Sequence, residues 1–337
     1  MVPLTEIVTS APGRVCLFGE HLDYLGLPVI AAAIGLRMQV MGGHTDGQEW
    51  IIDKPDLNEH DRFSGRGEVP YGLHGGGNFL RAAVNVLRRE GVALPGGAHF
   101  HVRGNVPVQA GTSSSSALQV AWIAALLALA EDPRAGDAEA IARLAYVSEV
   151  HEFGHSGGVM DQYTSALGGL VRIDPARDNA VTRLPARLGA FVLGNSKEPK
   201  DTQGILSRLR RAAHGGAEQL RQRLGTFDWD QTPLAQAEEL ANGSDELAVT
   251  LGALRNRDLL EHGHRVLSRE EPDHAELGRL LTAHHAVLRD ALGISTPRIE
   301  RMLEAALAAG ALGGKINGSG GGGCMFAYAP DRPEDVA

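Results

Sequence analysis

The segment Gly104-Asn-Val-Pro-Val-Gln-Ala-Gly-Thr-Ser-Ser-Ser-Ser-Ala-Leu118 decides the fold of this chain. It follows a strand-like run at 99–102 and leads directly into an apolar helical pattern at 117–130. Free backbone N–H groups at a helix start, together with the partial positive charge there, form an anion site. Four consecutive serines add hydroxyl groups that can donate hydrogen bonds or bind a metal. A phosphate site is therefore one interpretation, and a Ser-rich helix cap is the other, because Ser is a favoured capping residue.

Length and composition set the broad class of the protein. A chain of 337 residues is long for one hydrophobic core, so we expect two domains. A hydrophobic content of 43% and a charged content of 22% are ordinary for a soluble globular protein. The net charge of -9 argues against a nucleic-acid partner, although local cations and helix termini can still bind an anionic nucleotide.

Cysteine usage and hydropathy suggest where the protein works. Cys16 and Cys324 are the only cysteines, so no disulfide framework is expected and a reducing compartment fits. The longest apolar stretch, 120–130, is too short to span a bilayer, and no signal peptide precedes residues 3–5. We therefore expect a cytoplasmic protein without a membrane partner, present as a monomer or a homodimer.

Hydrophobic periodicity divides the chain into a mixed first half and a helix-rich second half. Strands are predicted at 15–18, 29–34, 38–41, 50–52, 99–102, 170–173, 190–193 and 324–328. Helices are predicted at 75–89, at 117–130, from 137 onward, and at 202–224, 233–265, 273–293 and 297–310. A Gly-rich turn is expected at 313–317. The polar, Pro-bearing connector at 174–185 suggests domains at 1–180 and 188–337.

A polar cluster follows the first apolar strand. Glu20, His21 and Asp23 come together directly after 15–18, which suits a polyhydroxylated ligand because carboxylates accept hydrogen bonds from sugar hydroxyls. The alternative is a solvated turn. Arg14 precedes this apolar run, and because charged side chains are usually exposed, it is expected at the surface.

Two carboxylates occur in surroundings that look apolar. Asp161 lies within the segment 157–163 beside Val159 and Met160, and a buried carboxylate is costly unless it is paired or catalytic. Glu149 lies on the apolar side of its predicted helix, whereas Glu152 lies off that side and should be solvated. An inward-facing Glu149 needs a cation, which is either a metal or an Arg or Lys side chain.

The segment Lys315-Ile-Asn-Gly-Ser-Gly-Gly-Gly-Gly-Cys324 is rich in glycine, which lets a backbone approach a ligand closely. It is not a dinucleotide fingerprint, because a strand and not a helix follows it. The Walker pattern is also missing, so phosphates would be bound without a P-loop lysine. His284 and His285 are adjacent on a predicted helix, point about 100° apart, and are expected to be structural.

These segments, in this order, resemble the GHMP small-molecule kinases, and most closely their galactokinase branch. The residues at 13–24 resemble the galactokinase signature, those at 106–118 the phosphate loop, and those at 158–162 the catalytic-aspartate segment. The segments 285–290, 294–297 and 315–324 are similar to the C-terminal part of the family. The resemblance implies an α+β, two-domain GHMP kinase fold: a ribosomal-S5-like α/β domain, a helix-rich C-terminal α+β domain, and the active site between them.

The resemblance also implies roles for individual residues. Asp161 would be the catalytic carboxylate facing the acceptor hydroxyl, and Arg14 would stabilise charge on the reacting oxygen or phosphoryl group. Ser115 and Glu149 match positions that hold Mg²⁺. The phosphates of ATP would lie against Gly111, Thr112, Ser113, Ser114, Ser115 and Ser116, and the sugar against Glu20, His21, Asp23 and Gly158. Phosphoryl transfer needs mainly positioning and charge neutralisation, which this set supplies.

Some positions depart from the galactokinase pattern. Cys16 stands where Asn is usual, and Leu22 where Thr is usual. Ser207 falls near the position of a tyrosine that contacts the sugar in galactokinases. The segment 303–324 resembles mevalonate kinases as much as galactokinases. The sugar pocket is therefore expected to be altered on one side.

Three functions remain open. The leading one is an ATP-dependent sugar kinase acting on the anomeric 1-OH of galactose or a related aldose. A mevalonate-type kinase would phosphorylate a primary alcohol on an anionic acceptor, which Glu20 and Asp23 would repel unless cations intervene. The same repulsion disfavours a uronic acid relative to a neutral sugar, although Arg14, Lys197 or Lys200 could compensate. A non-catalytic sugar and ATP sensor is disfavoured, because it would not need a complete phosphoryl-transfer set.

Overall fold

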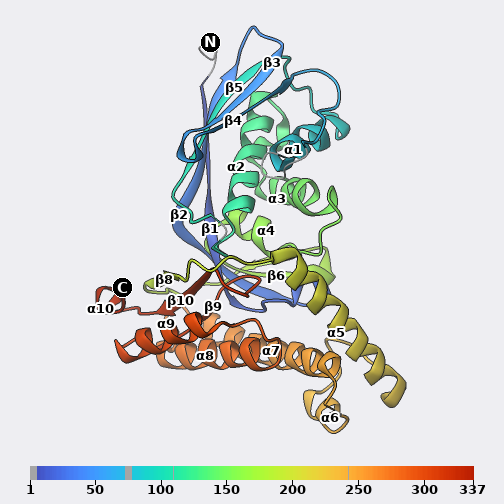
Figure 1. Ribbon diagram of the computed structural model, residues 1–337, viewed down its shortest axis with the longest axis vertical. Coiled ribbons are helices and arrows are strands. Elements are labelled where there is room, and N and C mark those ends of the chain that lie inside the picture. The colour runs from blue at the N-terminus through green and yellow to red at the C-terminus, as the bar shows by residue number, and fades with distance from the viewer. Residues whose placement is uncertain (1–5, 73–77, 109, 242) are drawn as a thin grey trace.

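The computed structural model describes residues 6–337 except 73–77, 109 and 242. A large sheet with helices on one side forms the first half, and a small sheet with long helices forms the second (Figure 1). The expectations for residues 3–5, for the first turn of the helix at 75–89 and for Gln109 lie outside the described residues. Among the described helices, none is long and apolar enough to cross a membrane.

The N-terminal sheet has seven strands in the order β4-β3-β5-β2-β6-β7, and β1 pairs antiparallel with β2. The strands β3 and β5 are parallel, whereas the other pairs are antiparallel. The last eight residues of β1 are all buried, so its end is enclosed by other elements. The bounds are β1 (Ile7–Phe18), β2 (Val29–His44), β3 (Glu49–Lys54), β4 (Glu59–Ser64), β5 (Ala98–Gly104), β6 (Leu170–Asp174) and β7 (Ala180–Arg183).

Four helices cover one face of this sheet (Figure 1). They are α1 (Asn78–Arg89), α2 (Ser114–Leu129), α3 (Ala138–Tyr146) and α4 (Met160–Leu167). A π-helical turn, Val147–His151, continues α3. Trp122 of α2 is fully buried and packs edge-on against Trp50 and Phe100 of the sheet, which confirms its expected place in the core. Short 3₁₀ turns lie at Asp23–Leu25, Pro55–Leu57, Pro133–Gly136 and Pro175–Arg177.

The C-terminal half combines a three-stranded sheet with long helices. The sheet order is β8-β10-β9, with β8 (Phe191–Asn195), β9 (Gly313–Ile316) and β10 (Cys324–Tyr328). The helices are α5 (Thr202–Leu224), α6 (Leu234–Glu238), α7 (Asp245–Leu267), α8 (His274–Asp290), α9 (Pro297–Ala308) and α10 (Pro333–Val336). The side chains of Asp201, Ser244, Asp273 and Thr296 accept hydrogen bonds from first-turn N–H groups, which fixes where four of these helices begin.

Several sequence predictions are corrected by local turn chemistry. The predicted helix at 233–265 is interrupted, because Gly243 adopts a left-handed φ of 78° and Ser244 caps a new helix. The connector at 174–185 contains β7, which pairs back onto β6 after the left-handed residues Asp178 and Asn179. The N-terminal sheet therefore extends to Arg183. The predicted strands 29–34 and 38–41 are one strand, and the Gly-rich turn at 313–317 is largely the strand β9.

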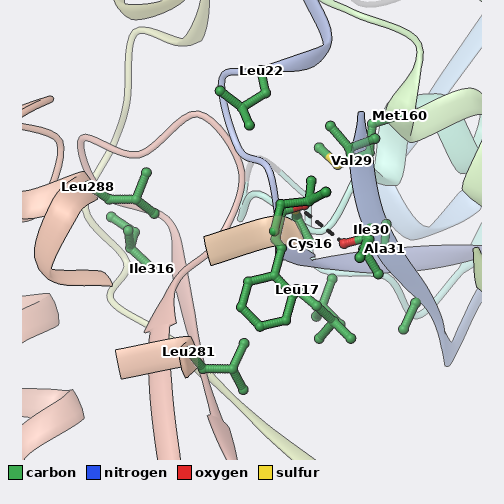
Figure 2. Close-up of a cluster of buried hydrophobic side chains, with 14 of the residues drawn as sticks. Cys16, Leu17, Leu22, Val29, Ile30, Ala31, Met160, Leu281, Leu288 and Ile316 are labelled. Atoms are coloured by element: carbon green, nitrogen blue, oxygen red, sulfur yellow. Dashed lines mark hydrogen bonds between the residues drawn. The ribbon is translucent and has the colours of Figure 1, made fainter. Parts of the chain in front are cut away.

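One hydrophobic cluster spans both halves, while a second cluster lies wholly within the N-terminal half. Figure 2 shows Leu17 and Ile30 of the N-terminal sheet packed with Leu281 of α8 and Ile316 of β9. All four side chains are fully buried. The end of β1 therefore belongs to both halves, and this placement brings its polar residues next to the Gly-rich segment between β9 and β10.

Candidate active site

Arg14 and Asp161 form the central ion pair of the site. Arg14 Nε donates to Asp161 Oδ1 at 2.7 Å, and Nη2 lies 2.5 Å from the same oxygen. Arg14 Nη1 also donates to the carbonyl of Gly111 at 2.6 Å. Arg14 is only 3% exposed, so its default interpretation as a surface residue is wrong. Burial opposes its charge most strongly, but Asp161, together with the neighbouring Cys16 and Glu20, raises the pKa of Arg14.

The start of α2 lies beside this pair and is not capped by its own serine. Ser113 occupies the cap position with a left-handed φ of 59°, and its side chain makes no capping bond. Its buried Oγ has no hydrogen-bond partner among the described residues. The helix-cap interpretation therefore fails for Ser113, and backbone N–H groups at this helix start remain available to an anion.

Gly111 lets the loop before α2 approach the C-terminal half. Its φ is +84°, and a Cβ there would lie 2.5 Å from the carbonyl oxygen of Asn317. Neither the backbone angle nor the contact tolerates a side chain. Thr112 is fully buried, and its carbonyl accepts from the backbone N–H of Arg14 at 3.2 Å. This loop therefore touches both Arg14 and the Gly-rich segment.

Glu149 lies close to the serines of α2. It is buried, and Gln162 Nε2 donates to its Oε2 at 2.7 Å. Burial raises the pKa of Glu149, and hydrogen bonds from Gln162, Ser115 and Ser116 only partly offset this. Among the described residues no Arg or Lys pairs with Glu149, so that alternative is wrong, and its carboxylate with the Ser115 hydroxyl offers oxygen donors of the kind that Mg²⁺ prefers.

Glu152, which follows on the same segment, is not solvated as expected. It lies 2.6 Å from Arg89 Nη2 and accepts from the hydroxyl of Tyr71. Its side chain is 14% exposed, and it has no part in the site.

Asp23 and Gly158 are in contact, and Asp161 lies close enough to influence Asp23. The backbone N–H groups of Met160 and Tyr24 donate to Asp23 at 3.2 and 3.0 Å. A Cβ on Gly158 would lie 2.0 Å from Asp23 Cγ, so only glycine fits there. Burial raises the pKa of Asp23 to about 6, and the nearby charge of Asp161 adds to this despite the two N–H donors.

His21 is buried beside Tyr24, in surroundings that favour the neutral imidazole. Its Nδ1 lies 3.0 Å from the hydroxyl of Tyr24, and burial lowers its pKa to about 4. Its buried Nε2 has no hydrogen-bond partner among the described residues. An acceptor hydroxyl could therefore use Nε2, because a neutral imidazole can donate or accept a hydrogen bond.

Glu20 lies in a buried ion pair instead of a solvated turn. Lys315 Nζ contacts its Oε1 and also donates to the carbonyls of Cys16 and Ile316, each at 3.0 Å. Glu20 is 1% exposed and Lys315 is fully buried. The negative charge of Glu20 is thus neutralised by Lys315, a partner 295 residues away that no local sequence pattern indicates.

Two further residues of the C-terminal half reach the site. Asn317 accepts from the backbone N–H of Cys16 at 2.9 Å and donates to the carbonyl of Gly111 at 2.8 Å, so it joins β1 to the loop before α2. Lys200 Nζ donates to Ser319 Oγ at 3.2 Å. Burial and the charge of Arg14 lower the pKa of Lys200 to about 8. Of the three cations considered from sequence, Arg14 and Lys200 lie at the site, whereas Lys197 is exposed.

The histidine pair on α8 is structural, as expected. His284 Nδ1 lies 3.2 Å from the carbonyl of Leu17, and His285 Nε2 lies 2.8 Å from Glu300. The two rings therefore serve different partners. Ser207, near the position of the galactokinase tyrosine, lies 3.2 Å from Ser156 Oγ.

Family models match three parts of the chain. Residues 78–169 match the GHMP kinases N terminal domain, and residues 264–337 match the GHMP kinases C terminal model. Together with the identities given below, these matches establish the family. This chain belongs to the GHMP kinases. The matched parts of this GHMP kinase include α2, Glu149, Asp161 and the Gly-rich segment. Residues 3–44 also match the galactokinase galactose-binding signature, which includes Arg14 and Asp23.

Two curated relatives of this GHMP kinase have different activities. A galactokinase of Haemophilus influenzae is 32% identical over 99% of this chain and 88% of its own length. A mevalonate kinase of Thermococcus onnurineus is 30% identical over 98% of this chain and 92% of its own length.

Solved structures confirm the fold. Galactokinase of Lactococcus lactis complexed with galactose has a TM-score of 0.84 at 19% identity, covering 99% of this chain and 87% of that chain. Mevalonate kinase of Methanococcus jannaschii has a TM-score of 0.75 at 19% identity, covering 99% and 94%. The expected α+β fold with N- and C-terminal GHMP kinase domains is thus confirmed, and the chain is a phosphotransferase of this family.

Proposed function

We propose that this GHMP kinase transfers the γ-phosphoryl group of ATP to a hydroxyl, the anomeric 1-OH, of galactose or a related aldose. The observation that carries the proposal is the Arg14–Asp161 pair beside the uncapped start of α2. It places a carboxylate, a cation and an anion site within one small region, as phosphoryl transfer requires. The galactose-binding signature at 3–44 and the 32% identity with a galactokinase support the sugar as acceptor.

The phosphate side of the reaction is assigned to the start of α2. Backbone N–H groups and hydroxyls from Gly111 to Ser116 would bind the phosphates of ATP, which kinases of this family use. Ser115 and Glu149 would hold Mg²⁺, since Glu149 is a buried carboxylate without a cationic partner among the described residues. When bound, Mg²⁺ neutralises phosphate charge.

The acceptor side is assigned to Asp161 and its neighbours. Both contacts from Arg14 use Oδ1 of Asp161, and within the described residues no hydrogen bond reaches Oδ2. The acceptor hydroxyl would donate to Oδ2, while Arg14 stabilises the developing negative charge. Asp23, His21 and Gly158 would form the surface that orients the sugar. Glu20 would contact it through Oε2, the oxygen that Lys315 leaves without a hydrogen bond.

A mevalonate-type kinase is the second candidate, and one observation favours it. The ion pair with Lys315 neutralises Glu20, and Lys200 adds a positive charge near Arg14, so repulsion of an anionic acceptor is weaker than the sequence suggested. The 30% identity with a mevalonate kinase is in line with this candidate.

A coupled ADP-release assay with Mg-ATP tests the proposal. The acceptor panel is galactose, N-acetylgalactosamine, L-arabinose, glucuronate, galacturonate, a heptose and mevalonate. We expect turnover with a neutral aldose, and a loss of at least about 100-fold in kcat for Asp161→Asn, because this removes the carboxylate that accepts the proton. Turnover with mevalonate and with no sugar would contradict the proposed sugar kinase and support the mevalonate-type kinase. ATP binding without turnover of any acceptor would favour a sensor.

A further inference from the structure

Three side chains that have no part in the candidate active site converge on the N-terminal sheet. They are Asp53 of β3 and His99 and His101 of β5. One ligand atom from each lies within 4.8 Å of the others. Figure 1 shows β3 and β5 at the end of the sheet that is remote from the C-terminal helices. The cluster shares no residue with the proposed Mg²⁺ site at Ser115 and Glu149.

Strand geometry explains why these residues meet. His99 and His101 are two positions apart on β5, so they face the same side, while Ala98, Phe100 and Val102 face the core. The parallel neighbour β3 pairs Asp53 with His101 directly. The carboxylate therefore lies on the same face as both imidazoles. His101 is 48% exposed, so an ion from solution can reach the cluster.

The distances suit a metal with short bonds to nitrogen and oxygen. His99 Nε2 lies 2.7 Å and His101 Nδ1 3.5 Å from Asp53 Oδ2. Donors bound tetrahedrally to Zn²⁺ at its usual bond lengths lie about 3.3 Å apart, between these two values. The two rings lie 4.7 Å apart between centroids and are tilted by 44°, and one ligand atom of each residue lies within 4.8 Å of the others.

We infer that Asp53, His99 and His101 form a site for Zn²⁺ or a similar transition metal. Two imidazoles and one carboxylate are donors that zinc accepts, whereas Mg²⁺ and Ca²⁺ prefer oxygen-only sets. Water completes the fourth position. Because the ligands come from both strands, the bound ion ties β3 to β5 and stabilises the folded chain in proportion to its free concentration.

Zinc titration of the chelator-treated, full-length protein tests this inference. Calorimetry and thermal unfolding are measured for the parent chain and for His99→Asn/His101→Asn. We expect one high-affinity zinc per chain and a higher Tm with zinc. In the double variant we expect zinc affinity to fall by more than about 100-fold. Removing only a residue that hydrogen-bonds to a metal ligand already lowers metal affinity by about 10–100-fold.

His44→Asn is the matched control, because His44 lies on the same sheet but pairs with Ala98 and so faces the opposite side. It should bind zinc as the parent does, and kinase activity should be unchanged in both variants. Cobalt should give the strong visible absorption of a tetrahedral site only where His99 and His101 are intact. Unchanged zinc affinity in the double variant, or no zinc uptake by the parent at micromolar concentration, would overturn the inference.

Discussion

Asp23 is the residue whose protonation we expect to control acceptor binding. Burial raises its pKa to about 6, so its carboxylate gains a proton and loses its charge as the pH falls through that value. We expect kcat/KM for the acceptor to decline about tenfold per pH unit below this pKa, while KM for ATP stays constant. Steady-state profiles from about pH 5 to 8 measure this. If Asp23→Asn keeps the same acidic decline, another group is responsible.

Lys200 is the cation that we expect to act on the phosphates. Its Nζ would lie 3.3 Å from a Cβ placed on Gly111, so the ammonium is beside the proposed phosphate loop. We expect Lys200→Met to lower kcat/KM for ATP by about tenfold to a hundredfold, since a hydrogen bond to a charged group is worth ~1.5–3 kcal/mol. Lys197→Met, at an exposed lysine nearby, should leave the kinetics unchanged. A change in acceptor KM alone would place Lys200 on the acceptor side instead.

The sequence patterns predicted which residues form the candidate active site, but not which of these side chains are buried or what they pair with. Glu20, Asp23, Glu149 and Asp161 were identified from motifs and apolar surroundings. The buried partners of Arg14 and Glu20 were not foreseen, because they lie 147 and 295 residues away in the chain. A local pattern carries no information on such distant pairs, so burial of a charge cannot be predicted from its neighbours alone.

Elements with strong local signals were predicted closely. The helix α5 and the strand β10 have the expected bounds, since an acidic cap, a left-handed glycine and a run of apolar residues are all local features. The long helix at 233–265 was wrong because a cap inside a helical pattern was overlooked. The edge strand β4 was missed, since only Phe63 of its six residues is buried.

Lys315 of β9 binds the carbonyl of Cys16 in β1 and forms a buried ion pair with Glu20, which follows β1. We expect Lys315→Met to lower the free energy of unfolding by about 3–5 kcal/mol, because it leaves the charge of Glu20 buried without a partner. The double variant Lys315→Met/Glu20→Gln should recover most of this loss, since neither side chain is then charged. Urea denaturation of the parent and the variants gives the comparison. A double variant no more stable than the single one would contradict this account.

At the scale of the whole molecule, we expect one cooperative unfolding transition. The cluster that joins β1 and β2 to α8 and β9 spans both halves, so unfolding of one half exposes apolar surface of the other. In scanning calorimetry the calorimetric and van't Hoff enthalpies should therefore agree. Leu281→Ala shortens a fully buried side chain of the cluster that spans both halves. It should lower the free energy of unfolding by about 2–5 kcal/mol and move the single transition to a lower temperature. Two resolved transitions would show that the halves unfold independently.

The overall architecture was predictable in outline. Length suggested two domains, and four motifs in the family order suggested the fold. The shared core was not predictable, because the composition of β1 is that of any buried strand, and its partners in α8 and β9 are set by tertiary packing.

The same arrangement has a consequence during synthesis on the ribosome. Cys16 and its hydrogen-bonding partner Asn317 are 301 residues apart, so the first strand emerges long before the segment that encloses its end. At usual translation rates the apolar end of β1 waits on the order of 15–60 s for that segment. During this interval the apolar side chains of Leu17 and Phe18, which are fully buried in the folded protein, are exposed and can bind a chaperone. A chain that is released before Lys315 is synthesised lacks β9 and the segment after it, so these side chains stay exposed. We expect such a chain to be degraded.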